Sequence, residues 1–461
     1  MTFWILRTSK WLTLALHFSG PHLTKGAIIN IRNSEIRLLP HMKHNIRIIL
    51  AGAIGNLLEW YDFGLYGLLA PVLASLFFPG HDRIASLLAV YGGFAGGFAM
   101  RPIGAVALGH LADRLGRRFV LTLSVLLMGL STVAVGFLPT YRTLGVWAPL
   151  LLIVIRLFQG FSVGGEFVDS VTYLVESAPP GRRGFAGSIA NLGSTAGMLL
   201  GSAAAATVTT LASPVTLTAW AWRVPFLAGG VIASAAYLLR RHLPETKSEA
   251  EVTAQPRSVA PLRQAIQAQP WILLATLLFT AGYGIVNYVT MVLLPTYAHE
   301  FAHIADQQAL RINASGQALA LFVVPLFGWL SDRFWTRRTA LAVAFFAEAI
   351  FSWKAFQLVG SHGVFGLWIA QLVFAFLLAV VMGNAPAMLS EQFEPRYRVS
   401  AHAVAFNIGI GIFGGTAPMV AVALMRATTS SMAPAIYLCF AAILATVGVL
   451  ALRDRSRESL T

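Results

Sequence analysis

Long apolar segments separated by short polar connections make up most of the chain from residue 46 onward. We count twelve such segments, each long enough to cross a bilayer as a helix of about 20 residues. Their approximate limits are 46–78, 86–110, 118–138, 146–176, 184–211, 220–239, 270–298, 309–331, 338–360, 362–390, 398–425 and 431–452. The pattern predicts an all-α integral membrane protein with twelve transmembrane helices.

One long polar connection, residues 241–268, separates the sixth segment from the seventh and carries three prolines. It divides the chain into two six-helix bundles. Met42 begins a stretch that is typical of the start of a bacterial permease, so we expect the region before it to be dispensable or a mis-assigned start. The predicted units are an N-terminal cytoplasmic extension (1–45), the first bundle (46–240), a central cytoplasmic loop (241–268), the second bundle (269–452) and a short cytoplasmic tail (453–461).

Composition and charge agree with this prediction. Apolar residues make up 57% of the chain and charged residues 11%, whereas a soluble domain carries about 25% charged residues. Of the 33 Lys and Arg, 25 fall in connections on one side of the predicted membrane, five on the other and three within spans. The positive-inside rule therefore places both termini in the cytoplasm. The net charge of +14 is explained by membrane topology and requires no nucleic acid, so we expect a multi-pass protein in the lipid bilayer of the cell inner membrane.

The first apolar segment carries polar side chains where a membrane helix should be apolar. Residues 55–67 read GNLLEWYDFGLYG, with Glu59 and Asp62 less than one helical turn apart. A carboxylate at the centre of a membrane helix costs at least ~2.5–3.5 kcal/mol, so two of them require a function or a partner. Helical spacing places Asn56, Glu59 and Tyr66 on one face, with Asp62 one step round from it.

Three further charged residues lie at membrane depth: Arg101 on the second span, and Arg156 and Glu166 on the fourth. Arg101 should lie near the depth of Glu59, and an arginine at such depth must face protein or water. We interpret Glu59, Asp62 and Glu166 as candidates for proton coupling. The alternative is that these carboxylates and arginines form static ion pairs, which only hold the first, second and fourth spans together.

The two halves of the chain repeat each other. GHLADRLGRR (109–118) joins the second and third spans, and GWLSDRFWTRR (328–338) joins the eighth and ninth. Glu176 and Glu391 end the fourth and tenth spans in the same way, each followed by two arginines. A duplicated six-helix unit with its site between the halves is a recurrent plan of secondary transporters.

The repeated charges lie at the predicted inner ends of helices. Opposite charges at such positions can pair in one conformation and separate into water in another. We therefore predict a cytoplasmic gate, and the alternative is that these residues only anchor helix ends at the membrane surface. The predicted gate residues are Asp113, Arg114, Arg117, Glu176, Arg183, Asp332, Arg333, Glu391 and Arg398.

Several stretches together resemble one family of transporters. The loop GHLADRLGRR and its repeat resemble the signature of the major facilitator superfamily. GNLLEWYDFGLYG, RPIGAVALGHLADRLGRR, RLFQGFSVGGE and FNIGIGIFGGTAP resemble the metabolite:proton symporter family within it, from about residue 45 to 452. The pattern departs after GGE, where Phe167, Val168 and Asp169 follow, and in the second loop, where Trp335 and Thr336 stand in place of a glycine.

The resemblance implies the major facilitator fold, with the first and fourth spans lining the cavity of the first half and Arg101 free to bind a substrate carboxylate. Members of the family carry α-ketoglutarate, citrate, shikimate, dicarboxylates, and proline or betaine. The second half has no carboxylate opposite Glu59, and the repeat places Tyr283 there. The residues we expect to bind substrate are Asn56, Tyr66, Arg101, Arg156, Gln159, Tyr283, Asn287, Asn384 and Asn407.

Together these features predict a monomeric proton-coupled symporter that imports a small organic acid by alternating access, with no cofactor. The embedded cations Arg101 and Arg156 favour an acid as the substrate. A zwitterionic osmolyte such as proline or betaine is the alternative, because relatives that carry zwitterions share these arginines. The chain ends nine residues after the last predicted span, without the coiled-coil extension of osmosensing carriers, which favours the acid.

One motif points to another class of protein. HEFAH (299–303) matches the zinc-protease pattern HExxH, in which two histidines on one helical face hold the metal. The match falls at the outer end of the seventh span, with no third ligand at a plausible depth. We predict that the chain is not an enzyme and holds no metal. A non-transporting nutrient sensor of the same fold would need a signalling partner or domain.

Overall fold

The computed structural model of the chain describes residues 40–115, 117–163, 166–179, 181–241, 261–458 and 460, and these residues form helices and connections without a strand. The predicted extension before residue 40 and most of the central loop lie outside the described residues. The helices of the first half are α2 (Pro40–Leu68), α3 (Ala70–Phe77), α4 (Arg83–Ala99), α5 (Arg101–Leu115), α6 (Arg117–Phe137), α7 (Tyr141–Leu144), α8 (Trp147–Ser162), α9 (Glu166–Ser177), α10 (Arg183–Leu211), α11 (Pro214–Thr216), η2 (Leu217–Ala221) and α12 (Arg223–Arg240).

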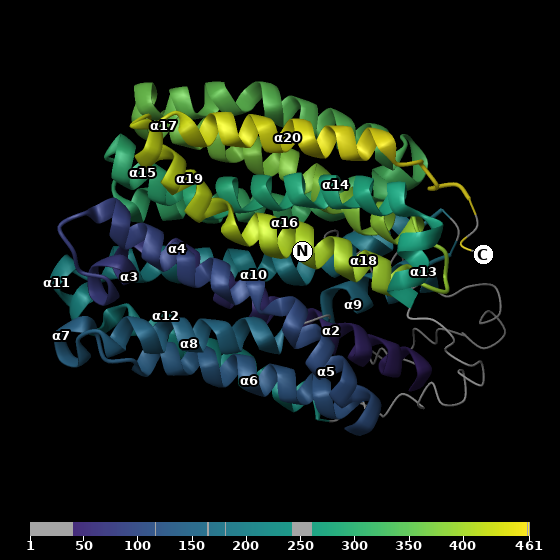
Figure 1. The fold of residues 1–461 in the computed structure, drawn as a ribbon, viewed down its shortest axis with the longest axis horizontal. Helices are drawn as coiled ribbons and strands as arrows, with labels where there is room; N and C mark the ends of the chain where they lie inside the picture. Colours follow the sequence, from purple (N-terminus) through teal and green to yellow (C-terminus); the bar gives the residue numbers. More distant parts are fainter. Residues whose placement is uncertain are drawn as a thin grey trace, which may run out of the picture.

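The second half begins with a short helix that leads into its first span. Its elements are α13 (Pro261–Ala268), α14 (Pro270–Tyr288), η4 (Val289–Leu293), α15 (Leu294–Ala302), α16 (Asp306–Arg333), α17 (Arg337–Glu391), α18 (Arg398–Phe406), η5 (Asn407–Gly414), α19 (Gly415–Thr428) and α20 (Ala433–Ala451). In Figure 1 the helices from α2 to α12 and those from α13 to α20 occupy opposite halves of the molecule.

The helices account for the twelve predicted spans. Eight helices of the described chain are long and apolar enough to cross a membrane, and two more crossings are bent pairs: α2 with α3, at 65°, and α11–η2 with α12, at 45°. Helix α17 has 55 residues and breaks at Gly363, where φ is 54° and ψ is −129°. Only glycine adopts that backbone conformation readily, so α17 is two crossings joined by a tight turn. Helices α8 and α9 together make the remaining crossing.

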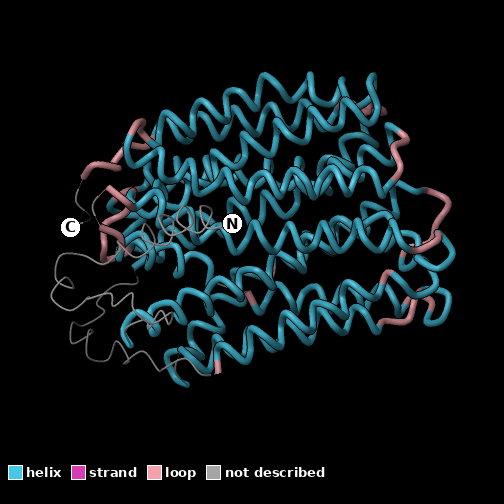
Figure 2. The backbone as a smooth tube through the Cα atoms, turned by 180° about the vertical axis from the view of Figure 1, so that it is seen from behind, coloured by secondary structure: helices cyan, strands magenta, loops and turns pink. Residues whose placement is uncertain are grey.

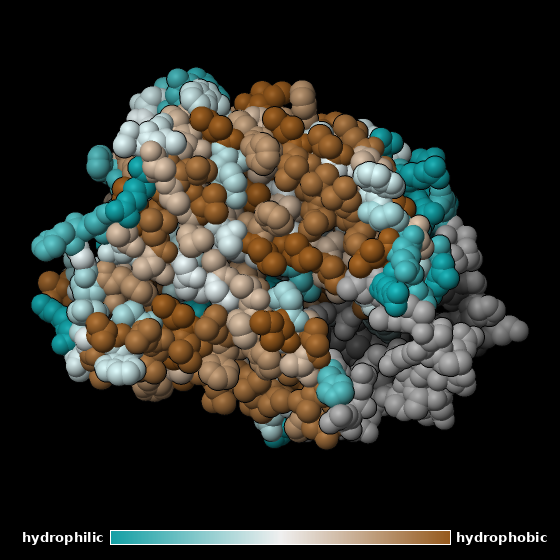
Figure 3. Space-filling model, in the orientation of Figure 1, coloured by the Kyte–Doolittle hydropathy of each residue, from teal (hydrophilic) through white to brown (hydrophobic). Residues whose placement is uncertain are grey.

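The surface has the pattern expected of a bundle that crosses a bilayer. On the face drawn in Figure 3, hydrophobic side chains cover the middle and hydrophilic ones gather at the two ends. Connections cluster at the same two ends when the bundle is seen from behind (Figure 2). Helix α2 begins and the C-terminus lies at one of them (Figure 1). We call this the inner end and the opposite one the outer end, because the distribution of basic residues predicts that the first faces the cytoplasm.

Glycine lets two helices of the first half cross in near-contact. A Cβ atom added at Gly160 on α8 would lie 1.7 Å from the carbonyl oxygen of Gly97 on α4, so no larger residue fits there without separating the helices. Such small-residue contacts are how membrane helices approach closely, since lipid offers little hydrophobic drive for their association. The contact fixes α8 against α4 next to Arg156, whose carbonyl also lies against Gly97.

We expect Gly160→Ala to destabilise the protein, because the added methyl group must push the two backbones apart. Overpacking of this kind costs about 1–3 kcal/mol, which should lower the melting temperature of purified protein in detergent. Gly360→Ala is the matched control, since nothing lies within 4 Å of a Cβ added at Gly360. Equal melting temperatures for the two variants would show that the α4–α8 crossing is not closely packed.

Candidate functional site

The first buried ion pair joins α2 to the start of α5. Arg101 Nη1 lies 2.8 Å from Glu59 Oε1, and the two side chains are 3% and 4% exposed. The guanidinium carbon of Arg101 stands 5.4 Å from the ring centroid of Phe98 and 6.0 Å from that of Phe63. Arg101 Nε has no hydrogen-bond partner among the described residues. The predicted neighbours Glu59 and Arg101 are thus in contact, and the guanidinium keeps unused donor capacity.

The carboxylate of the second ion pair accepts more hydrogen bonds than that of the first, although Nε and Nη2 of its arginine, Arg156, have no hydrogen-bond partner among the described residues. Asp62 lies 2.7 Å from Arg156, with both side chains fully buried. Its carboxylate also accepts hydrogen bonds from Gln159 Nε2 and Thr132 Oγ1, each at 2.8 Å. Arg156 donates to Gln159 Oε1 at 2.6 Å as well. Because three donors converge on one carboxylate, Asp62 ties α2 to α6 and α8.

Tyr66 belongs to this second pair rather than to the first. Its ring centroid lies 4.2 Å from the guanidinium carbon of Arg156, and its hydroxyl donates to the carbonyl of Val90 at 3.1 Å. Phe63 stands 5.0 Å from the same guanidinium carbon, so its ring lies between the two arginines. Asn56 is buried, and its Oδ1 has no partner within the described part of the chain.

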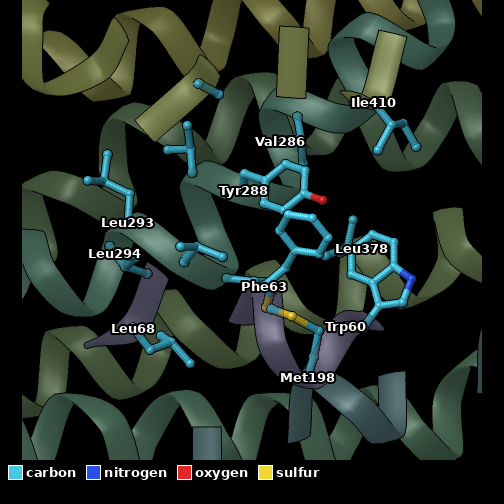
Figure 4. Packing of buried hydrophobic residues seen from close by; sticks show 14 of the residues in the cluster. Trp60, Phe63, Leu68, Met198, Val286, Tyr288, Leu293, Leu294, Leu378 and Ile410 are labelled. Atoms are coloured by element: carbon cyan, nitrogen blue, oxygen red, sulfur yellow. The ribbon is translucent and has the colours of Figure 1, made fainter. Parts of the chain in front are cut away.

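The second half faces the first ion pair with a tyrosine, but not the expected one. Tyr288 at the end of α14 stacks on Trp60 at 6.1 Å and meets Phe98 edge-on at 5.2 Å. Figure 4 shows Tyr288 directed toward Phe63 and Trp60 of α2. Tyr283, which the repeat places opposite Glu59, instead lines a separate cavity between the halves. The residue numbering of the repeat was therefore off by about one and a half helical turns on this span.

The other predicted polar residues of the second half make local contacts. Asn384 donates to the carbonyl of Val380 at 2.7 Å and Asn407 to that of Ala403 at 2.9 Å, each within its own helix. Asn287 is buried. The side chain of Glu166 is not among the described ones.

A small cavity of about 10 Å³ lies between the two halves, on the inner side of Tyr288. Sequence reasoning missed one of its residues, His402, because a single histidine in an apolar span gives little signal. The cavity is lined by Phe167, Asn191, Tyr283, Ala385, Pro386, Leu389, His402 and Phe406.

Ion pairs join the halves at the inner end, where the gate was predicted. Asp332 on α16 accepts hydrogen bonds from the backbone N–H groups of Gly184 and Phe185, at 2.8 and 2.9 Å. These groups open α10 of the other half, where unpaired N–H groups favour an anion. Arg398 of the second half pairs with Glu176 of the first.

The centre of the inner cluster is Arg337, which the sequence analysis did not include. It lies 2.8 Å from Asp332 and 2.6 Å from Glu391. Arg183 stands 3.6 Å from Glu391. Arg333 instead lies over the ring of Trp329, at 5.0 Å. The side chains of the predicted gate residues Asp113, Arg114 and Arg117 are not among the described ones.

The segment after α20 packs against this cluster. Arg183 Nη1 donates to the carbonyl of Glu458 at 2.7 Å, and Asp454 accepts from the backbone N–H of Arg338 at 3.0 Å. Burial alone would raise the pKa of the Asp454 carboxyl, but hydrogen bonds from Arg338 and Ser456 hold the pKa below its ordinary value. Asp454 therefore stays ionised at neutral pH and keeps its contacts.

Contacts between the halves also exist at the outer end, and none was predicted. Arg83 lies 2.7 Å from Glu300, and Asp82 lies 2.7 Å from Arg426. Deeper in, Tyr91 donates to Thr296 at 3.0 Å. The two halves are thus tied together on both sides of the buried ion pairs.

The HEFAH segment lacks the geometry of a zinc protease. Helix α15 ends at Ala302, and His303 has a left-handed backbone with φ of 54°. His303 therefore does not lie one turn below His299 on a helical face. His299 Nδ1 contacts Asp306 at 3.3 Å, and no cluster of three metal-ligating side chains occurs among the described residues.

Twelve apolar crossings in two halves, charge pairs buried at their centre and ties between the halves at both ends define a multi-pass membrane transporter. A family model described as Major Facilitator Superfamily matches residues 52–334. The chain belongs to that superfamily.

Curated relatives extend the match along the whole chain. The chain is 30% identical to a proline/betaine transporter of Salmonella typhimurium over 95% of its length and 87% of the relative's. It is 32% identical to a citrate-proton symporter of Klebsiella pneumoniae, with coverage of 90% and 93%. Among solved structures, the xylose transporter XylE from E. coli matches with a TM-score of 0.70 and 17% identity, covering 90% of this chain and 98% of that one. The last is a likeness of fold.

We expect Asp62→Asn to destabilise the protein strongly, because it leaves Arg156 buried without a counter-charge. Breaking one side of a buried ion pair costs about 3–5 kcal/mol. Thr132→Val removes only one of three donors and should cost about 1 kcal/mol. Thermal unfolding of both variants in detergent measures the difference, and equal stabilities would refute the central place of the Asp62–Arg156 pair.

We expect Asp332→Asn to loosen the inner end. Losing a charge-assisted contact costs about 1.5–3 kcal/mol, which raises the population open at that end by about tenfold or more. The readout is maleimide labelling of a cysteine at the buried position Ser390, in a Cys439→Ala background, from the cytoplasmic side. Asp82→Asn at the outer end is the control and should leave this labelling unchanged; labelling equal to that of the parent in both variants would contradict the role of Asp332.

Proposed function

We propose that this chain is a proton-coupled symporter of the cell inner membrane, which imports a small organic acid by alternating access. The observation that carries the proposal is the buried pair of Glu59 and Arg101. In the structure Glu59 neutralises Arg101. A substrate carboxylate fits the same guanidinium, whose fork makes charge-assisted paired bonds.

Coupling follows from the exchange of partners. When substrate takes Arg101, Glu59 loses its close ion-pair partner in the interior of the membrane and keeps the weaker influence of Arg240, and a poorly compensated carboxylate is costly there. Binding a proton removes that cost, so substrate and proton bind together. When the substrate leaves, Glu59 returns to Arg101 and releases the proton.

The relatives support a carboxylate as the shared chemical feature. One is named for citrate and protons, the other for proline and betaine, and each of these solutes has a carboxylate. A zwitterionic osmolyte is the second candidate. The aromatic rings of Trp60, Phe98 and Tyr288 near Arg101 favour it, because ring faces bind ammonium groups.

In this proposal the other residues either hold the site in place or control access to it from the two ends. Asp62, with its full set of donors, holds Arg156 and Gln159 in place, and the coupling falls to Glu59. The inner cluster around Asp332 and the outer contacts open in turn, as the bundles 46–240 and 269–452 rock against each other. One chain suffices for this cycle, and it needs no cofactor.

One proton can drive useful accumulation. A charge that moves down the membrane potential contributes about 2.3 kcal/mol per 100 mV, and each 1.4 kcal/mol is a factor of ten in concentration. One proton per substrate therefore supports roughly fortyfold accumulation at 100 mV for a substrate that is neutral overall. An anionic substrate gains less, because its own charge opposes the potential.

We expect Glu59→Gln to keep substrate exchange but to lose accumulation driven by a proton gradient. The glutamine leaves Arg101 free for the substrate and removes the proton site. Counterflow and gradient-driven uptake in proteoliposomes, with citrate, 2-oxoglutarate, proline and betaine as probes, separate the two activities. Accumulation equal to that of the parent protein would defeat the assignment.

Arg101→Lys provides the companion measurement. A lysine keeps the positive charge but loses the fork, so the KM for the transported acid should rise by about tenfold or more. An uncoupler added to the parent protein should reproduce the Glu59→Gln result without mutation. An unchanged KM in Arg101→Lys would place the substrate carboxylate elsewhere.

A further inference from the structure

His402 is a buried histidine whose ring has no hydrogen-bond partner in the part of the chain that the structure describes. It lies on α18 with no solvent exposure, and neither Nδ1 nor Nε2 is hydrogen-bonded to any described residue. A neutral imidazole carries one donor and one acceptor, and leaving both unpaired in the protein interior is unfavourable. Packing alone does not explain an imidazole at a site where a hydrophobic side chain would be stable.

The ring borders the cavity between the two halves. Its neighbours there are Phe167 and Asn191 of the first half and Tyr283 and Pro386 of the second. Asn191 already donates to the carbonyl of Met382 across the interface, at 2.6 Å. The imidazole is therefore a polar group with free hydrogen-bonding capacity in a largely apolar wall.

The cavity lies on the route between the Glu59–Arg101 pair and the inner end. Tyr283 precedes Tyr288 by five residues on α14, which is about 7.5 Å along a helix, and Tyr288 covers the aromatic residues around Arg101. On the other side, His402 follows Arg398 by one turn of α18, and Arg398 pairs with Glu176 at the inner end. A substrate that moves inward from Arg101 meets His402 before it reaches the gate.

We propose that His402 is a specificity-determining residue, which binds a second hydrogen-bonding group of the substrate, namely a hydroxyl or a second carboxyl. The inference rests on the proposed function and narrows its substrate class to hydroxy acids and di- or tricarboxylic acids. Such molecules present a polar group at each end, one for Arg101 and one for the imidazole. A betaine has one carboxylate and a methylated ammonium, and the ammonium offers the imidazole no hydrogen bond.

With the two halves in contact, the cavity measures about 10 Å³, which is room for about one water molecule. A substrate group therefore reaches the imidazole only when the halves separate at this level, as they do in the proposed cycle. The stacked rings of Phe167 and Phe406, 4.8 Å apart, limit the space next to the imidazole. A site that uses a buried hydrogen-bonding group discriminates strongly against a ligand that lacks the matching group.

The test compares His402→Leu with His402→Gln in proteoliposome counterflow, with citrate, malate, proline and betaine as probes. Leucine removes both hydrogen-bonding atoms, whereas glutamine keeps a donor and an acceptor. We expect the KM for citrate or malate to rise at least about tenfold in His402→Leu and to stay within about threefold in His402→Gln. The maximal rate should change less than the KM.

Thr172→Val is the matched control. Thr172 is also buried with an unpaired side-chain oxygen, but it does not line the cavity, so the KM should not change. If His402→Leu fails to fold, as judged by size-exclusion chromatography in detergent, His402→Ala, which also removes both hydrogen-bonding atoms, takes its place in the comparison with His402→Gln. An unchanged KM in a folded His402→Leu or His402→Ala overturns the inference.

The outcomes also separate this inference from the proposed function. If the parent protein transports none of the four probes with a proton gradient, the proposed function fails. If it transports proline or betaine and not the acids, symport stands and the role of His402 falls. If it transports an acid with a KM that does not depend on residue 402, the function stands and the specificity is set elsewhere.

Discussion

The absence of water from the bilayer interior governs the centre of this molecule, because each buried charge there must have an opposite charge within reach. Glu59 with Arg101, and Asp62 with Arg156, meet that condition at 2.8 and 2.7 Å. Breaking either pair leaves a charge in a medium of low polarity at a cost of several kcal/mol. Helices α2, α5 and α8 can therefore pack only in arrangements that bring both ion pairs into contact. The Gly97–Gly160 contact allows α8 to lie directly against α4 in this arrangement.

The carboxylates of the two ion pairs differ in the number of donors that contact them. Asp62 has three donors, which lie on two other helices, α6 and α8. Glu59 makes one close ion pair, with Arg101, and the charge of the buried Arg240 also acts on it. A carboxylate with one close partner can exchange that partner for a substrate or a proton, while one held by three donors cannot do so without unpacking the helices. This difference in donors is why the proposed function assigns the coupling to Glu59 and a structural role to Asp62.

The sequence predicted the residues whose burial in a membrane costs much free energy, and it missed those whose burial costs little. Glu59, Asp62 and Arg101 stand out because an ionised group in an apolar segment needs an explanation. Thr132 gave no such signal, because a threonine in a membrane helix can bond its own backbone, as it also does here to Met128. The contact of Tyr288 with Trp60 was not predicted, because only the tertiary structure shows which tyrosine of α14 reaches that tryptophan.

The residues at the inner and outer ends of the molecule were also predicted only in part. The internal repeat pointed to Asp332 and Glu391, since both halves carry an acid at the same place. It pointed to Arg333 as well, whereas the structure uses Arg337. Arg333 follows Trp329 by four residues on α16, so it lies on the same face and its guanidinium covers that ring. No repeat relates Arg83 to Glu300, so their contact could come only from the assembled fold.

The contacts between the halves differ in strength at the two ends, and in the proposed transport cycle this difference determines which end opens first. At the inner end, Arg183 of the first half lies 3.6 Å from Glu391 of the second, with side chains 7% and 0% exposed, and breaking a buried pair is costly. At the outer end Arg83 is 41% exposed, and Arg426 and Asp82 are about half exposed; such pairs contribute about 0–1 kcal/mol each. Opening the outer end therefore costs less than opening the inner end in the absence of substrate. A carrier that faces outward at rest meets its solute first on the side from which an importer must take it, and the more stable inner cluster then requires the binding of substrate and proton before it opens.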